Sequence, residues 1–398
     1  MRVLITAGAG RGGISTSLIV LAEGLIGRGH TVYCALWIDS TGKDDYLVAR
    51  LESCGAQLHI EYLSGIPLSR RFIRRVLVVR DIVRREKIDV VNPHYGGDVV
   101  AGPIVLGSYL AGRPAVASFH GGEQAKKYSF AWFKDRVFGN LASYTTVINK
   151  QMRQEVLRRF PRRKNVVLIP PPGLPLAMNL LPKDVRAKYG IPASDFVLGT
   201  VSRIDANKRV GRSIEAFAKS KAFSGGGWFV LCGFGPLEEE TIKLGQRLLG
   251  DQFVFLGRMD DPSEAYALMD AFILLSENEG LGNCFVEAAR MGLPLIGTDV
   301  GGVPEIVVHE KSGILVGKDD FNGTVQAIDR LWVDESLRRR LGDGGREHSQ
   351  RFSPESYIDA FEEILSQAQK RRRRGYATAG MALAFEAAHL MSLASNIA

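Results

Sequence analysis

The chain has 398 residues, of which 45% are hydrophobic and 24% are charged, and its formal net charge is +8. This composition is that of a folded globular protein and excludes an intrinsically disordered chain. The length exceeds what one hydrophobic core supports, so we expect two domains of ordinary size. No uncharged apolar run of about 18 residues occurs, which argues against a membrane-spanning helix.

The first residues lead directly into a predicted strand, without the basic segment and apolar stretch of a signal peptide. The four cysteines are scattered and lack the spacing of a metal site. They are Cys34, Cys54, Cys232 and Cys284. We therefore expect reduced, structural cysteines and a cytoplasmic protein.

The N-terminal half alternates short apolar strands with helical patterns. Strands are predicted at Val3–Thr6, Thr31–Leu36, Gln57–Glu61, Ile88–Val91, Ala115–Phe119 and Tyr144–Ile148. This alternation predicts an α/β fold with a mainly parallel sheet covered by helices on both faces. We assign residues 1–170 to this first domain.

A glycine-rich loop at residues 7–13 separates the first strand from a helix. Gly12 and Gly13 would let the backbone approach a ligand closely. Dinucleotide-binding dehydrogenases have a similar loop, but they also carry an acid at the end of the second strand. Here Asp39 lies beyond that strand in a polar turn. A purely structural turn is the other alternative.

Residues 70–87 form a basic amphipathic pattern, with eight basic and two acidic residues and a local charge of +6. Such a helix can lie on an anionic membrane surface, or it can cover the sheet with a solvated outer face. The sequence leaves both alternatives open. Nucleic acid is not expected as a partner, because no nucleic-acid-binding motif accompanies the charge.

Two histidines follow predicted strands of the first domain. His94 lies in Asn92-Pro-His-Tyr-Gly-Gly97, where a structural, hydrogen-bonded histidine is favoured. His120 lies in Ser118-Phe-His-Gly-Gly-Glu123, which places an imidazole at the lip of the sheet. For His120 a functional role is favoured.

The proline-rich segment 171–182 is predicted to be a linker, and a second strand–helix series occupies residues 183–352. Arg203 and Lys208 lie in a loop between a strand and a helix, where both can converge on one diphosphate. Two ordinary surface cations are the alternative. Gly233 follows another predicted strand and is expected to line a nucleotide.

The most informative stretch follows the buried strand predicted at Ala271–Leu275. Gly280 and Gly282 form a turn into a helix, with Glu279 at the mouth of the turn and Glu287 inside the helix. The helix start favours phosphate, while carboxylates accept hydrogen bonds from hydroxyl groups. A nucleotide sugar, anionic in the middle and hydroxyl-rich at both ends, satisfies both requirements. Two solvated surface acids are the alternative explanation.

The C-terminal part contains one more predicted helix, at residues 353–369, which begins with a serine cap and a proline. A basic and alanine-rich tail follows at residues 370–398. Contact with a membrane surface, packing on the first domain and disorder are open alternatives for this tail.

Glu279 and Glu287, with seven residues between them, and Gly297-Thr-Asp-Val-Gly-Gly-Val-Pro-Glu305 resemble the C-terminal signature of retaining glycosyltransferases of family GT4. The resemblance is specific over residues 276–305 and looser from the first strand to about residue 365.

The chain departs from the family pattern in the loop of Arg203 and Lys208, which resembles a Gly-Arg…Lys-Gly segment. Ser202 and Arg209 stand where glycines are common, so the conformation of this loop is open. Asn149 stands where many relatives carry a serine after the last strand of the first domain, and either residue donates a hydrogen bond.

The resemblance implies the GT-B fold, with two Rossmann-like, doubly wound domains, an interdomain cleft and the helix 353–369 on the first domain. It implies retaining transfer of a hexosyl-type sugar from a nucleotide diphosphate sugar to a hydroxyl group, in polysaccharide, lipopolysaccharide or glycolipid assembly. The acceptor would be a glycan or a lipid-linked glycan. No metal or other cofactor is expected, and the protein would be cytoplasmic or peripheral at the inner face of the membrane.

The resemblance also assigns roles. Glu279 would hold the donor sugar, Glu287 the ribose, and His120 would contact the sugar beside the reacting carbon. Arg203, Lys208 and the helix start would stabilise the departing diphosphate. Donor-binding residues are expected to be Gly12, Gly13, Arg203, Lys208, Gly233, Gly280, Leu281, Gly282, Asn283 and Glu287.

Two other classes of function remain open. A nucleotide-sugar epimerase or hydrolase of the same fold would need no acceptor. A non-catalytic nucleotide-sugar-binding protein would use the same residues and turn nothing over.

Overall fold

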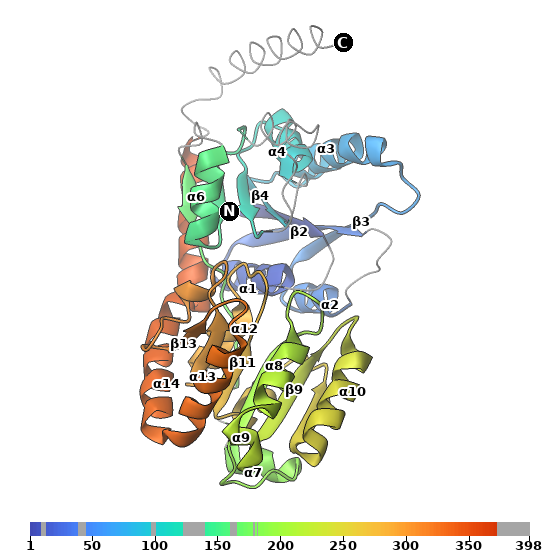
Figure 1. Cartoon of the computed structure of the whole chain (residues 1–398). Coiled ribbons are helices and arrows are strands. Elements are labelled where there is room, and N and C mark those ends of the chain that lie inside the picture. The colour runs from blue at the N-terminus through green and yellow to red at the C-terminus, as the bar shows by residue number, and fades with distance from the viewer. Residues whose placement is uncertain are drawn as a thin grey trace, which may run out of the picture. The chain divides into compact units, whose positions relative to one another are not determined.

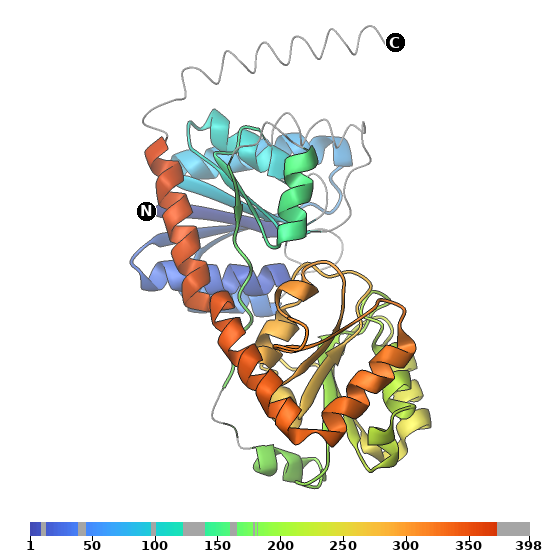
Figure 2. The ribbon, with the colours of Figure 1, turned by 60° about the vertical axis from the view of Figure 1, so that its left-hand side comes forward.

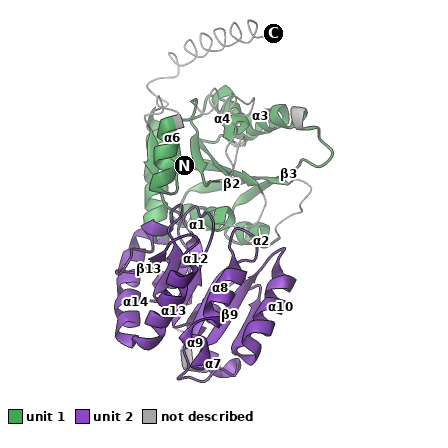
Figure 3. Cartoon of the chain, in the orientation of Figure 1, with its two compact units in different colours: residues 1–170, 354–398 green, residues 171–353 purple. Residues whose placement is uncertain are grey.

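The structure is a computed structural model that describes residues 1–8, 13–38, 45–96, 101–121, 140–159, 165–177, 180 and 182–371. The chain divides into two compact units: unit 1 comprises residues 1–170 and 354–398, and unit 2 comprises residues 171–353 (Figure 3). Each unit is built on one parallel sheet (Figure 1), so the predicted α/β class is confirmed.

Unit 1 contains a seven-stranded sheet in the order β3-β2-β1-β4-β5-β6-β7, in which all neighbouring strands run parallel. The strands are β1 (Arg2–Gly8), β2 (Thr31–Ile38), β3 (Gln57–Tyr62), β4 (Val90–Tyr95), β5 (Val116–Phe119), β6 (Tyr144–Val147) and β7 (Val166–Leu168). The helices are α1 (Gly13–Gly27), α2 (Asp45–Ser53), α3 (Leu68–Arg85), α4 (Ala101–Leu110), α6 (Lys150–Arg159) and a helix at 354–371.

Two apolar cores lie on the two faces of this sheet, because successive side chains of a strand point to opposite faces. Val3 and Ile5 of β1 belong to the core formed with α1, α2 and the helix at 354–371. Leu4 belongs to the core formed with α3, α4 and α6.

The helix at 354–371 lies along unit 1 (Figure 2). Its buried residues Phe361 and Leu365 pack in the same core as α1. Gly24 of α1 permits this close packing, since a Cβ there would lie 2.2 Å from Ile358 Cδ1. Glu362 adds an ion pair to Arg28 at 2.6 Å. The alanine-rich segment 372–398 lies outside the described residues.

Unit 2 contains a six-stranded parallel sheet in the order β10-β9-β8-β11-β12-β13. The strands are β8 (Val197–Arg203), β9 (Trp228–Phe234), β10 (Phe253–Gly257), β11 (Ala271–Leu274), β12 (Leu295–Thr298) and β13 (Gly313–Val316). The helices are α7 (Pro182–Lys188), α8 (Val210–Ala218), α9 (Lys221–Ser224), α10 (Glu238–Leu249), α11 (Ser263–Leu268), α12 (Asn283–Arg290), α13 (Phe321–Val333) and α14 (Glu335–Ser349). Short 3-10 turns occur at Gly250–Gln252, Val303–Glu305 and Gln350–Phe352.

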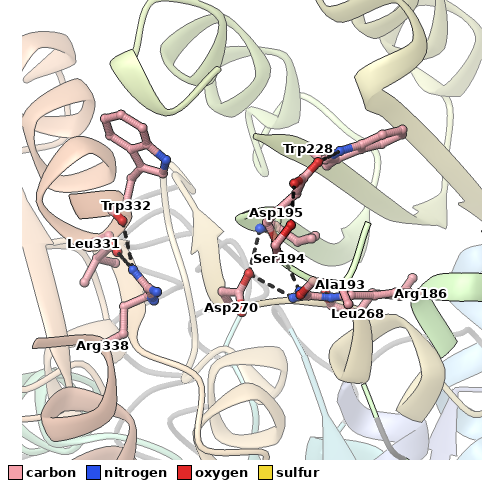
Figure 4. A network of polar contacts seen from close by, with 11 residues as sticks. Arg186, Ala193, Ser194, Asp195, Trp228, Leu268, Asp270, Leu331, Trp332 and Arg338 are labelled. Atoms are coloured by element: carbon pink, nitrogen blue, oxygen red, sulfur yellow. Dashed lines mark hydrogen bonds and ion pairs between the residues drawn. The ribbon is translucent and has the colours of Figure 1, made fainter. Parts of the chain in front are cut away.

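A buried polar network fixes the amino ends of two central strands of unit 2 (Figure 4). Arg186 of α7 forms an ion pair with Asp270 at 2.8 Å and donates to the Leu268 carbonyl at 3.0 Å. Asp270 also accepts the Val197 N–H at 2.8 Å, and Asp195 accepts from Trp228 Nε1 at 3.0 Å. The network therefore anchors the amino ends of β8 and β11. Ligands of open α/β sheets bind at the opposite, carboxyl ends of the strands.

Two strand predictions need correction, and one strand was missed. The fourth strand does not end at Val91 but continues to Tyr95, so His94 lies inside it rather than after it. Asn92 and Pro93 resemble a turn signal, yet Pro93 keeps its place in the ladder opposite Thr6. Likewise Gly233 lies inside β9 rather than in a turn after it. The short edge strand β7 was not predicted, because three residues carry too little periodicity.

Candidate functional site

The carboxyl end of β11 carries a compact polar cluster. Glu279, in the loop between β11 and α12, is only 8% exposed. Its Oε1 accepts a hydrogen bond from Ser276 Oγ at 2.8 Å and forms an ion pair with Lys208 Nζ. Leu281, buried in the core of unit 2, holds the same loop against the sheet. The structure thus brings together Lys208 and Glu279, which are 71 positions apart.

Lys208 stays charged in this cluster. Burial acts to lower the pKa of its ammonium group, but the Glu279 carboxylate, Cys284 and Asp205 act in the opposite direction, and the pKa is raised above its ordinary value. A half-buried cation beside the end of a parallel strand is suited to binding an anionic group.

Asn207 ties the loop of Lys208 to the loop of Glu279. Its Nδ2 donates to the Asn278 carbonyl at 2.9 Å, and its Oδ1 accepts the Asn278 N–H at 3.1 Å. The Glu277 N–H donates to the Asn207 carbonyl at 2.8 Å. The sequence analysis did not predict this role for Asn207. Its place beside Lys208, which was predicted to bind the ligand, is a local signal, because asparagine side chains often hydrogen-bond to the backbone of loops.

The segment after β12 closes on the same loop. Thr298 Oγ1 donates to the Ser276 carbonyl at 2.7 Å. A Cβ at Gly301 would lie 1.9 Å from the Glu279 carbonyl oxygen, and a Cβ at Gly302 would lie 2.1 Å from the Gly280 carbonyl oxygen. Both glycines are therefore required for backbone contact, which explains the two adjacent glycines of the motif.

Helix α12 begins directly after this loop, with Gly282 at φ +85° in the left-handed region before it. Asn283 is its first residue, and within the described part of the chain the buried Nδ2 of Asn283 has no hydrogen-bond partner. Gly280, Leu281, Gly282 and Asn283 thus lie together at the helix start, and the N–H groups at a helix start attract anions.

Glu287 lies one turn into α12 and is only 5% exposed. Its Oε1 accepts the Leu174 N–H at 3.0 Å, and its Oε2 accepts from Tyr266 at 2.7 Å. Burial raises the pKa of Glu287, although Leu174, Tyr266 and Arg290 act in the opposite direction. Tyr266 was not singled out in the sequence, because its pairing with Glu287 depends on tertiary packing.

Arg290, at the end of α12, holds two distant segments of unit 2. Its Nη1 donates to the Gly173 carbonyl at 3.4 Å and to the Leu174 carbonyl at 3.3 Å. Its Nη2 donates to the Phe352 carbonyl at 2.5 Å. The side chain therefore joins the first and the last residues of unit 2 to one helix.

Arg203 lies at the end of β8 and is 53% exposed in an ion pair with Asp205 at 2.9 Å. Asp205 also accepts the Lys208 N–H at 3.1 Å, so it stands between the two cations. Arg209 adopts φ +49°, the left-handed conformation for which a glycine is better suited, and pairs with Asp319 at 3.1 Å. Gly233 packs against the end of β8, since a Cβ there would lie 1.9 Å from the Ser202 carbonyl oxygen.

The two histidines of unit 1 form a direct contact. His94 is buried inside β4, and His120 is half-buried just after β5. His94 Nδ1 lies 2.9 Å from His120 Nε2. Burial lowers the pKa of His94 well below its ordinary value and lowers that of His120 to about 4.

The predicted glycine-rich loop is described only in part. Gly12 lies outside the described residues, while Gly13 is the first residue of α1, where its carbonyl accepts a hydrogen bond from Ser17 Oγ at 2.9 Å. Among the residues that the structure describes, no group of three or more histidine, cysteine, aspartate or glutamate side chains could hold a metal ion.

The basic helix α3 covers the sheet with Val79, Ile82 and Val83. Two large apolar residues point away from this core: Ile73 is 60% exposed and Leu77 is 40% exposed. Within the described ranges, no helix is long and apolar enough to cross a membrane.

Two family models match the chain. The model described as "Glycosyl transferases group 1" matches residues 183–348, and the model described as "Glycosyltransferase Family 4" matches residues 11–172. Between them the two models cover most of units 1 and 2.

Curated relatives include N-acetyl-alpha-D-glucosaminyl L-malate synthase from Bacillus anthracis, which is 28% identical over 74% of this chain and 79% of its own length. The capsular polysaccharide biosynthesis glycosyltransferase CapM from Staphylococcus aureus is 32% identical over 43% of this chain and 46% of its own length. The lipopolysaccharide core biosynthesis glycosyltransferase LpsE from Rhizobium meliloti is 31% identical over 46% of this chain and 53% of its own length. The match thus spans about half the length of the latter two relatives.

Solved structures with the same fold include a glycosyltransferase from Rickettsia africae, with a TM-score of 0.79 and 18% identity over 93% of this chain and 98% of that chain. HepE from Anabaena, solved in complex with UDP and glucose, has a TM-score of 0.73 and 22% identity over 92% of this chain and all of its own. These similarities, with the two parallel sheets, confirm the predicted two-domain Rossmann-like fold.

Proposed function

This chain belongs to the family 4 glycosyltransferases, of GT-B fold, and from that premise we propose that it transfers a hexosyl-type sugar from a nucleoside diphosphate sugar to a hydroxyl group with retention of configuration. The observation that carries the proposal is the cluster of Lys208, Glu279 and Ser276 beside the start of α12. A cation and a helix start suit a diphosphate, and a buried carboxylate suits sugar hydroxyl groups.

The chemistry depends on charge at the leaving group. When the bond between the anomeric carbon and the β-phosphate breaks, negative charge develops on the departing diphosphate. Lys208, Arg203 and the N–H groups at the start of α12 stabilise this charge. The transfer requires no metal, because these cations take its place.

The two carboxylates hold the neutral ends of the donor. Glu279 accepts hydrogen bonds from the sugar, and Glu287 accepts them from the ribose. Each carboxylate has about four lone-pair positions, so Glu287 retains acceptor capacity beside its bonds to Leu174 and Tyr266. His120 contacts the transferred sugar, while Gly12, Gly13 and Gly233 line the donor.

The acceptor is a glycan or a lipid-linked glycan in polysaccharide, lipopolysaccharide or glycolipid assembly. The names of the relatives from Staphylococcus aureus and Rhizobium meliloti support this class. The exposed Ile73 and Leu77, on a helix rich in arginine, would place the protein on an anionic membrane surface, peripheral and on the cytoplasmic side.

A thermal-shift screen of UDP-, GDP- and ADP-sugars tests donor binding, since a ligand that binds the folded state raises stability by mass action. The complex of HepE with UDP and glucose makes UDP-glucose the first donor to test. Product analysis with labelled donor, with and without a glycan acceptor, then separates transfer from hydrolysis or epimerisation. Absence of any stabilisation by the three donor classes would contradict the proposal.

A further inference from the structure

A series of hydrogen bonds joins the adjacent strands β4 and β5 of unit 1 and ends at His120. Asn92 Nδ2 donates to the Val116 carbonyl at 2.6 Å and to Ser118 Oγ at 2.8 Å. Asn92 Oδ1 lies 2.8 Å from His94 Nε2, and His94 Nδ1 lies 2.9 Å from His120 Nε2. Asn92 and His94 are buried and belong to β4.

The hydrogen bond between Asn92 and the Val116 carbonyl fixes the position of each proton in this series. The Val116 carbonyl can only accept, so the Asn92 amide must present its NH₂ group there and its oxygen to His94. His94 therefore carries its proton on Nε2, and its Nδ1 is a bare acceptor. That acceptor requires a proton on Nε2 of His120, so Nδ1 of His120 is unprotonated in the neutral ring.

The opposite direction would place the Asn92 oxygen 2.6 Å from the Val116 carbonyl oxygen, which is repulsive. A charged His94 would also break the order, but burial keeps its pKa well below the ordinary value. The ring of Phe361 stacks on His94 with centroids 5.7 Å apart, which limits rotation of the imidazole. Both rings are therefore held neutral and in one orientation.

His120 is itself held in place at the carboxyl end of β5, and ligands of open α/β sheets bind beyond the carboxyl ends of the strands. Its backbone N–H donates to the Tyr95 carbonyl at 2.9 Å, and the next residue, Gly121, adopts φ +99° in the region that favours glycine. Within the described ranges, Nδ1 of His120 has no hydrogen-bond partner. A nitrogen that can only accept selects a hydroxyl group and rejects a phosphate oxygen.

We propose that Asn92 and His94 are positioning residues that hold His120 in its Nε2–H tautomer, so that Nδ1 accepts a hydrogen bond from a hydroxyl group of the sugar. The inference rests on the proposed function for its ligand, while the tautomer itself follows from the contacts within unit 1.

Nitrogen NMR of the full chain labelled with ¹⁵N-histidine, without ligand, tests the tautomer directly, and His120→Asn assigns the signal. Near pH 7 we expect the proton on Nε2 of His120. His94→Phe keeps the stacking on Phe361 but removes the acceptor, and should leave a mixture of tautomers. His94→Asn offers an oxygen in place of Nδ1 and should restore the single tautomer. A proton on Nδ1 in the unmodified chain would overturn the inference, whether or not the variants fold.

Kinetics with UDP-glucose, UDP-N-acetylglucosamine and GDP-mannose tests the ligand contact. His94→Phe should lower kcat about tenfold, the effect of one hydrogen bond, while His94→Asn recovers most of it. Stabilisation by UDP alone should be equal in all variants, because UDP has no transferred sugar. An unchanged kcat in His94→Phe would overturn the role assigned to His94. If the unmodified chain neither binds nor consumes any donor, the proposed function fails, while the NMR measurement still decides the tautomer.

Discussion

At the scale of single residues, the candidate site depends on a few buried polar side chains whose partners are far apart in the sequence. Lys208 and Glu279 form the central ion pair, and Asn207 and Ser276 hold the two loops in register. Removing a charge from such a site raises the free energy of the transition state more than it lowers the stability of the fold, provided that the loops stay in place.

Lys208→Ala should therefore lower kcat by about 10²- to 10³-fold, since Lys208 is proposed to stabilise the departing diphosphate. Initial rates with saturating donor measure the effect, and circular dichroism checks that the fold survives. Lys219→Ala, an equal change of charge at the opposite end of α8, is the matched control. Normal turnover in Lys208→Ala would refute the role assigned to this residue.

The histidine pair predicts a dependence of stability on pH. The folded state holds the pKa of His120 at about 4, against 6.5 for the ordinary group, and burial lowers the pKa of His94 as well. Between pH 6.5 and about 4 the unfolded chain binds protons that the folded chain does not. The stability is therefore complete above pH 6.5 and decreases as the pH falls.

Between pH 7 and pH 5 we expect the free energy of unfolding to fall by about 2 kcal/mol through His120, and the lowered pKa of His94 should steepen this fall. Urea unfolding at a series of pH values measures the slope. The double variant His94→Phe/His120→Asn should flatten it, whereas His309→Asn, at an exposed position, should not. An equal slope in the double variant would show that other groups carry the pH dependence.

At the scale of elements, the sequence was most informative where one strand, one turn and one helix follow each other. The apolar run before Ser276 and the glycines at 280 and 282 predicted the β11–α12 unit, because each signal is local. The extension of β4 past Asn92 could not be predicted, since Asn-Pro resembles a turn and only the neighbouring strands show otherwise. The pairing of Lys208 with Glu279 depends on a tertiary contact that has no local signal, whereas Arg203 and Asp205 pair within one loop.

Gly302 offers a test of the packing between these elements. Gly302→Ala would place a Cβ 2.1 Å from the Gly280 carbonyl oxygen, so the loop of Glu279 must shift. We expect a loss of about 1–3 kcal/mol in the free energy of unfolding, together with a smaller thermal shift by nucleotide sugars. Gly27→Ala is the control, since nothing lies within 4 Å of a Cβ there. Full stability and full donor binding in Gly302→Ala would contradict this packing.

At the scale of the whole molecule, the chain passes between its two units twice, at residues 170–171 and 353–354. Unit 1 carries the basic helix α3 and the histidine pair, while unit 2 carries the cluster of Lys208 and Glu279. The parallel sheet of each unit could be read from the strand–helix alternation, while the assignment of residues 171–182 to a linker stays a prediction. Whether α3 contacts a membrane stays a prediction, since a helix that only covers the sheet and a helix that also binds a membrane fit the same sequence pattern.

Charge reversal of Arg70, Arg80 and Arg84 tests the membrane contact. Each basic residue near an anionic surface contributes about 1 kcal/mol, so three reversals should weaken binding to phosphatidylglycerol vesicles at least about 100-fold. Vesicle sedimentation measures the bound fraction, with phosphatidylcholine vesicles as a baseline. Arg339→Glu, on the exposed face of α14, is the matched control. Equal binding of the triple variant and the unmodified chain would leave α3 as a cover of the sheet alone.

Arg290 attaches α12 to the segments at both ends of unit 2. One guanidinium group holds the carbonyls of Gly173, Leu174 and Phe352, and the neighbouring Glu287 holds the Leu174 amide. Arg290 thus attaches to α12 both segments that connect the units, and it lies close in sequence to Glu287, the carboxylate proposed to bind the ribose. A ligand that replaces the Leu174 N–H on Glu287 would remove one of these contacts, so the proposed binding of the ribose there would weaken the attachment of residues 173–174 to α12.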